Sequence, residues 1–297
     1  MKSALTLTWG ECREPGLLQR VHDAGFDGIN FTYDENLFSG ADPEARLRQI
    51  RENLDAAGLA CPQVILPCPG HPASLEHYDE ASESPMEFAL RTMPVLGAKW
   101  GAVQPLSPVN PGFCREKVMT DNLVRFRQYL ELAERYDVNI AVENPLPVQD
   151  QPEQRFCGEP EELCAFVDRL EHPRAGVCWN IGHANQLGKD CFGRDTATPF
   201  DHTAAVQLLG SRVKTIHASD NFGDGHLRLP PGVGKLDWFQ PVQWGSLLRT
   251  LLKKGFAGFF TLDCDLNQGR RFPGMEAAFI TLCGRSAAAY AAEAEQN

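Results

Sequence analysis

The stretch Ile216-His217-Ala218-Ser219-Asp220-Asn221 decides the fold. A short apolar run ends there on a histidine and an acid, as the carboxyl end of a buried parallel strand does when it belongs to a functional site. Two earlier runs have the same design. Residues 139–144 end on a carboxylate and an amide, and residues 175–183 end on Asn180 and His183. Apolar strands that finish in metal-ligand or acid–base residues predict one shared site.

The whole chain alternates short apolar runs with longer amphipathic ones. Strands are predicted at 4–8, 27–31, 60–66, 100–104, 139–143, 174–180, 213–217 and 258–263. Helices are predicted near 15–24, 43–57, 84–96, 115–136, 159–170, 200–210, 240–253 and 274–292. This pattern predicts an α/β fold, a single-domain (β/α)₈ barrel over residues 1–297.

Local signals support these boundaries. Asp42-Pro43 and Glu159-Pro160 place proline in the first turn of a helix, where its missing N–H costs nothing. Glycine follows four helical runs just before the next strand, as helix C-terminal capping predicts; the four are Gly25, Gly58, Gly97 and Gly255. A doubly wound open sheet is the alternative, but no GxGxxG follows the first strand and no GxxxxGK[ST] occurs.

Composition narrows the class of protein. The 297 residues have a formal net charge of −11, which disfavours binding to a nucleic-acid backbone. The mean hydropathy is −0.30, and no apolar run approaches the roughly 20 residues of a membrane span. The first residues resemble a strand rather than a signal peptide, so we expect a cytoplasmic protein. The ten cysteines form no CxxC pair, and several in apolar runs (Cys61, Cys178, Cys264) are expected to be reduced and buried.

Ionisable residues are concentrated at the ends of the later strands. Because adjacent barrel strands lie about 5 Å apart, Glu143, Asn180, His217 and Asp263 are placed to coordinate one divalent cation. Three oxygen ligands and one nitrogen suit Mn²⁺ or Zn²⁺ best, with Mg²⁺ or Co²⁺ as alternatives. Each residue alone has an ordinary explanation, such as a helix cap or a turn. Their co-occurrence on four successive strands favours a site.

These residues also resemble a known family. Their order is similar to that of the xylose-isomerase-like TIM-barrel superfamily, in its sugar (phosphate) isomerase/epimerase branch. The matching motifs are Glu143-Asn144, Asn180-x-x-His183, His217-x-x-Asp220, Asp224-x-His226, Gly232-x-Gly234-x-x-Asp237-Trp238 and 258–263. The branch includes ketose 3-epimerases and inosose dehydratases.

The resemblance implies a metal site. The family's ligands are Glu, Asp, His and Glu on the fifth to eighth strands, which fall on Glu143, Asn180, His217 and Asp263. Two positions depart from this pattern. Asn180 replaces an anionic aspartate with a neutral amide, and Asp263 is shorter than glutamate by about 1.5 Å, one carbon–carbon bond. Weaker metal binding, a different reaction or a loss of catalysis would each be consistent with these changes.

The implied activity is metal-assisted proton transfer on a small sugar, sugar phosphate or cyclitol, through a metal-stabilised enediolate. Glu143 would be the first general base and Asp263 the opposing acid/base, and the same apparatus could also eliminate water. Family members often form oligomers, so a homo-oligomer is possible. Trp9 and Phe31 would pack on the sugar. The predicted substrate contacts are His183, Asp220, His226, Trp9 and Gln104.

Other classes of function remain open. Asp224-x-His226 resembles part of the multi-metal site of a zinc-dependent endonuclease within the superfamily, but the acidic charge and few histidines argue against phosphodiester cleavage. A Schiff-base aldolase is disfavoured because no strand candidate ends on lysine. Asn180 also fits a non-catalytic or partner-dependent sugar-binding barrel with a weakened metal site.

Overall fold

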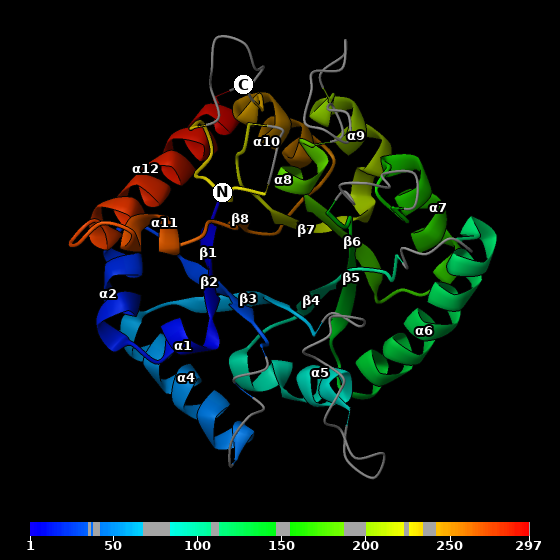
Figure 1. Ribbon diagram of the computed structural model, residues 1–297, viewed down its shortest axis with the longest axis horizontal. Coiled ribbons are helices and arrows are strands. Elements are labelled where there is room, and N and C mark those ends of the chain that lie inside the picture. The colour runs from blue at the N-terminus through cyan, green and yellow to red at the C-terminus, as the bar shows by residue number, and fades with distance from the viewer. Residues whose placement is uncertain are drawn as a thin grey trace.

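Eight parallel strands form the centre of the molecule, and helices surround them (Figure 1). The computed structural model describes residues 1–34, 37, 42–67, 84–107, 113–146, 155–186, 200–222, 226–233 and 242–296. The strands are β1 (Ser3–Thr8), β2 (Gly28–Thr32), β3 (Ala60–Ile65), β4 (Trp100–Val103), β5 (Asn139–Glu143), β6 (Ala175–Asn180), β7 (Val213–His217) and β8 (Phe260–Leu262). The predicted (β/α)₈ barrel is confirmed, and each strand lies within two residues of its expected bounds.

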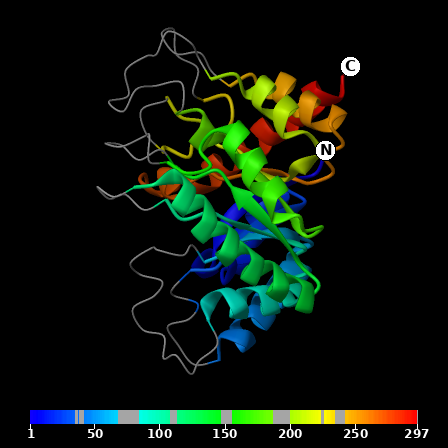
Figure 2. The same ribbon diagram turned by 90° about the vertical axis from the view of Figure 1, so that its right-hand side faces the viewer.

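The helices form the outer layer. The long ones are α2 (Pro15–Asp23), α4 (Pro43–Ala57), α5 (Pro85–Leu96), α6 (Arg115–Arg135), α7 (Pro160–Leu170), α9 (His202–Leu209), α10 (Trp244–Lys253) and α12 (Glu276–Glu295). Short helices that the sequence analysis did not predict are α1 (Trp9–Cys12), α8 (Ile181–Ala184), α11 (Asn267–Arg270) and the 3₁₀ turn η3 (Gly210–Arg212). Figure 2 shows both chain ends on one side of the molecule, where the Met1 amino group contacts Glu295.

Trp9 illustrates one of these differences. It directly follows the predicted strand 4–8 and begins α1. Thr8 caps this helix with Glu11 in a reciprocal capping box: Thr8 N–H donates to the Glu11 carboxylate, and Glu11 N–H donates to Thr8 Oγ1. The chain therefore turns into a helix directly after the strand.

The barrel closes between β7 and β8 through a single bridge. The sheet order is β7-β6-β5-β4-β3-β2-β1-β8, and the two ends meet where Ala218 pairs with Leu262. Ala218 N–H donates to Thr261 O and Asp263 N–H donates to Ala218 O, both at 2.8 Å. The residues after His217 and before Asp263 thus join the two edges.

The main apolar core lies between the strands and the helices. Phe31, expected to contact a sugar, is fully buried in this outer core against Tyr33, so that expectation is wrong. Inside the barrel, a separate small cluster of Ala102, Ala141 and Cys178 packs against Trp100. Small side chains there leave room for the polar groups nearer the strand ends.

Two further expectations concern membrane and redox class. In the described ranges, no helix is both long enough and apolar enough to span a bilayer. The cysteines in these ranges are all free, and most are buried, as the sequence indicated.

We expect Gly284→Ala to destabilise the protein by about 1–3 kcal/mol. Gly284 lies on α12, and a methyl group there would stand 2.0 Å from the carbonyl oxygen of Ala24 at the end of α2. Gly16→Ala is the matched control, since the nearest atom is a movable Arg20 nitrogen at 3.6 Å. Urea unfolding should show Gly16→Ala unchanged or slightly stabilised, and equal losses for both variants would contradict the packing argument.

Candidate active site

The carboxyl ends of β5 to β8 bring the predicted residues to one end of the barrel. Glu143, Asn180 and His217 are the last residues of β5, β6 and β7, and Asp263 directly follows β8. In the ladder, Asn180 pairs with His217, so these two side chains stand at the same level. Gln104 follows β4 beside Glu143, because Val103 pairs with Val142.

The Glu143 carboxylate is the centre of this group. Its Oε1 accepts a hydrogen bond from Asn180 Nδ2 at 2.8 Å and lies 2.7 Å from His217 Nδ1. Its Oε2 accepts from Gln104 Nε2 at 3.1 Å. On the far side of the imidazole, Nε2 lies 3.1 Å from the Asn30 amide nitrogen. The register therefore directs three side chains at one buried carboxylate.

Charge at this centre is stabilised by pairing. Burial works against ionisation of Glu143, but His217 and Asn180 outweigh it and lower the pKa of Glu143 to about 2. Burial also disfavours a charged His217, yet Cys178 and the Glu143 carboxylate raise the pKa of His217 well above its usual value. At neutral pH the Glu143 carboxylate is ionised and accepts a hydrogen bond from His217 Nδ1.

Asp263 is paired with Arg228. Arg228 Nη2 donates to Asp263 Oδ1 at 2.6 Å, and Arg228 Nε donates to the Asp263 carbonyl at 3.3 Å. Burial opposes ionisation of this acid, but Arg228 and His217 hold the pKa of Asp263 below its usual value. Arg228 was not predicted from the sequence, because it reaches Asp263 through the bridge between Asp220 and Leu229, which no local sequence pattern indicates.

Two histidines stand beside the carboxylates. His183 lies on α8, with Nδ1 2.8 Å from the carbonyl oxygen of Asn144, and its ring meets that of His226 edge-on at 4.7 Å. Burial lowers the pKa of His183 to about 3 and also lowers the pKa of His226. Both rings are therefore neutral at neutral pH. With Nδ1–H donating to Asn144, His183 Nε2 is left as an acceptor.

These groups line one cavity of about 300 Å³ at the strand ends, within the lower range for small-molecule sites. Predicted residues that line it are Gln104, Glu143, Asn180, His183, His217, His226 and Asp263; Arg228 lines it too. Thr6, Thr8, Glu11 and Asn267 add polar groups to its wall. The cavity wall therefore carries many polar groups and both signs of charge, set among apolar side chains such as Ile65, Leu146 and Leu266.

Two predicted contact residues lie elsewhere. Asp220 is fully buried behind the cavity, where its carboxylate accepts from Gly232 N–H at 2.8 Å and from the Trp244 indole at 3.4 Å. Trp9 lies against the guanidinium groups of Arg13 and Arg46, 4.7 and 5.3 Å from its ring. Neither lines the cavity of the described residues, and their contact with a substrate stays a prediction. Asp224 and 234–238 lie outside the described residues.

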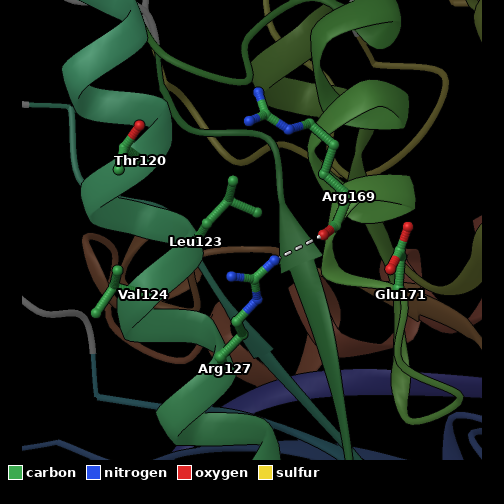
Figure 3. A pocket seen from close by; sticks show the side chains of 6 residues that line it. All are labelled: Thr120, Leu123, Val124, Arg127, Arg169 and Glu171. Atoms are coloured by element: carbon green, nitrogen blue, oxygen red, sulfur yellow. Dashed lines mark hydrogen bonds between the residues drawn. The ribbon is translucent and has the colours of Figure 1, made fainter.

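A second hollow lies on the outside of the barrel between α6 and α7 (Figure 3). Thr120, Leu123 and Val124 line one side of it, and Arg127 crosses to donate to the carbonyl of Arg169 at 3.4 Å. None of the strand-end residues contributes to it. We therefore place the candidate active site at the barrel end.

The donor set at the barrel end fits a divalent cation. Ligand atoms of Glu143, His217 and Cys178 lie within 4.8 Å of one another. One is an anionic oxygen and one an imidazole nitrogen, both ordinary ligands of Zn²⁺ and Mn²⁺. Asn180 and Asp263 stand at the same end of the barrel and offer oxygens. Glu143 and His217 are thus the two predicted ligands that the structure brings into direct contact.

The fold and the site define the class of protein: a closed (β/α)₈ barrel with acids and histidines at its strand ends. The chain belongs to the xylose isomerase-like TIM barrel family, whose sequence profile matches residues 18–278. The family resemblance expected from the strand-end motifs is confirmed.

Individual relatives are distant. The uncharacterized protein MJ1311 of Methanocaldococcus jannaschii is 26% identical over 168 residues, 52% of this chain and 49% of that protein, so the match spans about half of the relative's length. A D-psicose 3-epimerase solved in the presence of D-fructose has a TM-score of 0.64, with 15% identity over 98% of this chain and 97% of that one. A xylose isomerase-like TIM barrel protein from Mycobacterium smegmatis in complex with magnesium also has a TM-score of 0.64, with 16% identity over 99% and 96%. At this level of identity, the structural similarity shows the shared fold.

We expect Asn180→Asp to destabilise the cation-free protein by about 3 kcal/mol, because a second carboxylate would face Glu143 where an amide now donates at 2.8 Å. Divalent cations should reverse this loss by neutralising the pair. Thermal melts with a chelator and with added Mn²⁺ or Zn²⁺ measure both effects. Asn139→Asp, at the half-buried start of β5, is the control and should show no cation-dependent shift. A cation-independent loss at Asn180 would contradict the expectation.

A pH effect is expected at His202, which supports α8 from behind. His202 Nε2 lies 3.2 Å from Asn185 Oδ1, Asn185 donates to Asn221 at 3.0 Å, and Asn221 donates to the Gly182 carbonyl at 2.7 Å. Burial lowers the pKa of His202 to about 3. His202 therefore binds a proton near pH 6.5 in the unfolded chain, whereas in the folded chain it binds one only near pH 3. Stability contributed by the neutral ring is complete above this pH and falls as the pH drops towards 3.

Between pH 7.5 and 5.0, the wild-type protein should lose about 2 kcal/mol more unfolding free energy than His202→Gln does, at about 1.4 kcal/mol for each pH unit below 6.5. Urea titrations at both pH values measure the difference. His22→Gln, at an exposed histidine, serves as the control and should keep the wild-type slope. Equal slopes for wild type and His202→Gln would show that His202 is not buried in the neutral form.

Proposed function

We propose that this chain is a divalent-metal-dependent isomerase or epimerase of a small sugar or cyclitol, acting by proton transfer next to a carbonyl group. The observation that supports this most directly is a pair of buried carboxyl groups, Glu143 and Asp263, lining one small cavity. Proton transfer from carbon needs such a base, held close to the substrate and shielded from water.

A bound divalent cation would act as a Lewis acid on the substrate carbonyl and the neighbouring hydroxyl. Glu143 and His217 would hold it, with a third ligand from the side chains nearby. Lysine-based carbonyl chemistry has less support, because none of the residues that line the cavity is a lysine among those the structure describes.

Glu143 is proposed as the first base. His217, Asn180 and Gln104 fix its two oxygens, so the carboxylate is positioned before a substrate enters. Its low pKa keeps it ionised, and its oxygens face the cavity. Preorganisation of this kind removes the cost of orienting the base during reaction.

Asp263 is proposed as the opposing acid/base. Arg228 fixes one of its oxygens. Because the resting carboxylate is ionised, the proton that Asp263 delivers to the opposite face of the substrate carbon is first taken up from solvent. His183 is proposed to accept a hydrogen bond from a substrate hydroxyl through Nε2, since its Nδ1–H is used by Asn144. The buried Nε2 of His226 has no hydrogen-bond partner among the described residues and lines the same cavity, which suits a second hydroxyl contact.

The substrate class follows from the cavity. Its volume of about 300 Å³ and its many donors and acceptors suit one sugar ring or open-chain sugar. The similarity of the fold to a D-psicose 3-epimerase adds support for a ketose. Whether the substrate is phosphorylated depends on groups outside this cavity wall.

The test is solvent exchange at carbon. Wild-type protein loaded in turn with Mn²⁺, Zn²⁺, Mg²⁺ and Co²⁺ is incubated in D₂O with a panel of ketoses, aldoses and inosose-type cyclitol ketones. NMR should show deuterium entering next to the carbonyl with epimer, isomer or dehydrated product. Glu143→Gln and Asp263→Asn should each reduce the rate by about 10²–10⁴-fold.

Glu171→Gln is the matched control, an exposed acid in the outer hollow of Figure 3, and should keep the wild-type rate. No exchange with any sugar and any cation, while a sugar still binds by calorimetry, would refute catalysis and favour the sugar-binding barrel. Cleavage of abasic DNA at a rate that depends on Glu143 would instead favour the phosphodiesterase.

A further inference from the structure

Cys178 lies directly beneath the proposed site. It is on β6 two residues before Asn180, so both side chains point into the barrel. The β5–β6 ladder pairs it with Glu143. It is fully buried and packs in one small cluster with Ala102 and Ala141.

The sulfur is close enough to share an ion with its neighbours. Cys178 Sγ, a His217 ring nitrogen and a Glu143 carboxylate oxygen lie within 4.8 Å of one another. Bonds of about 2.0–2.3 Å to a tetrahedral ion place ligand atoms roughly 3.5 Å apart, so only small side-chain shifts are needed. No other group of His, Cys, Asp and Glu side chains meets this distance criterion within the described ranges.

The other two predicted ligands are engaged elsewhere. Asn180 Oδ1 accepts the His183 N–H at 3.0 Å as the cap of α8, and its Nδ2 donates to Glu143. Asp263 is neutralised by Arg228 at 2.6 Å. A cation bound by both would have to break the helix cap geometry and the ion pair. Cys178 makes side-chain hydrogen bonds to His217, itself a proposed ligand, and to Thr215, so its recruitment breaks neither a helix cap nor an ion pair with arginine.

We infer that Cys178 is the third protein ligand, with Glu143 and His217, of a thiophilic divalent cation such as Zn²⁺. A thiolate favours Zn²⁺ and Co²⁺ over Mg²⁺ and Mn²⁺, which prefer oxygen. Glu143 and His217 line the cavity while Cys178 does not, so the ion would keep an open position towards the substrate. The inference rests on the proposed metal dependence and names the metal class.

Cobalt substitution provides a readout that does not depend on turnover. Apo protein titrated with Co²⁺ should develop a thiolate-to-cobalt charge-transfer band in the near ultraviolet that saturates at one equivalent. In Cys178→Ser the band should vanish. Zn²⁺ affinity should fall roughly tenfold or more, while Mn²⁺ affinity changes little.

Matched controls separate this cysteine from the others. Cys114→Ser changes an exposed thiol and should leave the band intact. Asp263→Asn should also leave it intact, because Asp263 is not among the inferred ligands. Cys178→Ala, matching the alanines beside it, serves as a second variant should serine disturb the packing.

Several results would overturn the inference: Co²⁺ binding by wild type without the band, a band that persists in Cys178→Ser, or no binding of any cation. If the band behaves as expected but no sugar exchanges deuterium, the proposed function fails and the metal site stands. If Mn²⁺ supports exchange and the band is absent, only the inference fails.

Discussion

The arrangement of the site depends on the need to pair and hydrogen-bond the buried Glu143 carboxylate. An ionised carboxylate inside a barrel costs several kcal/mol unless it is paired and hydrogen-bonded. Side chains at the ends of three other strands offset this cost by hydrogen bonding to the carboxylate: Gln104 after β4, Asn180 on β6 and His217 on β7. The parallel ladder sets Gln104 level with Glu143. It sets Asn180 level with His217, two residues further along β6 than the partner of Glu143, so the positions of the site follow from the backbone ladder.

Residue size inside the barrel determines where a ligand has space. The large aromatic side chains, such as Phe31 and Trp179, are buried in the main core outside the strands. The interior beneath the site holds Ala102, Ala141 and Cys178 instead. A floor of small residues lets the polar side chains sit deep, which shields them from water and strengthens each electrostatic contact.

Much of this arrangement could be predicted because it depends on local pattern. Apolar runs with capping signals gave the strands, and the last residue of each run gave Glu143, Asn180 and His217. What failed depends on non-local geometry. Arg228 approaches Asp263 only because the loop after β7 pairs back with Asp220. Phe31 faces the helices, and its apolar strand alone does not indicate which of its side chains point into the barrel. Trp9 begins a short helix, α1, whose capping box is visible in the sequence as Thr8-x-x-Glu11.

The seam between β7 and β8 joins the stability of the fold to the geometry of its chemistry. The main chain of Ala218 makes both backbone hydrogen bonds of the bridge, and it lies between His217 and the residues that lead to the β7 loop. Asp263 donates one of those bonds through its own amide. The bridge that closes the barrel therefore also positions the His217 imidazole and the Asp263 carboxylate. Substitutions in the loop after β7 must therefore preserve both the closure of the barrel and the geometry of the site. A shift of Ala218 would break the β7–β8 bridge and misalign the His217 and Asp263 side chains together.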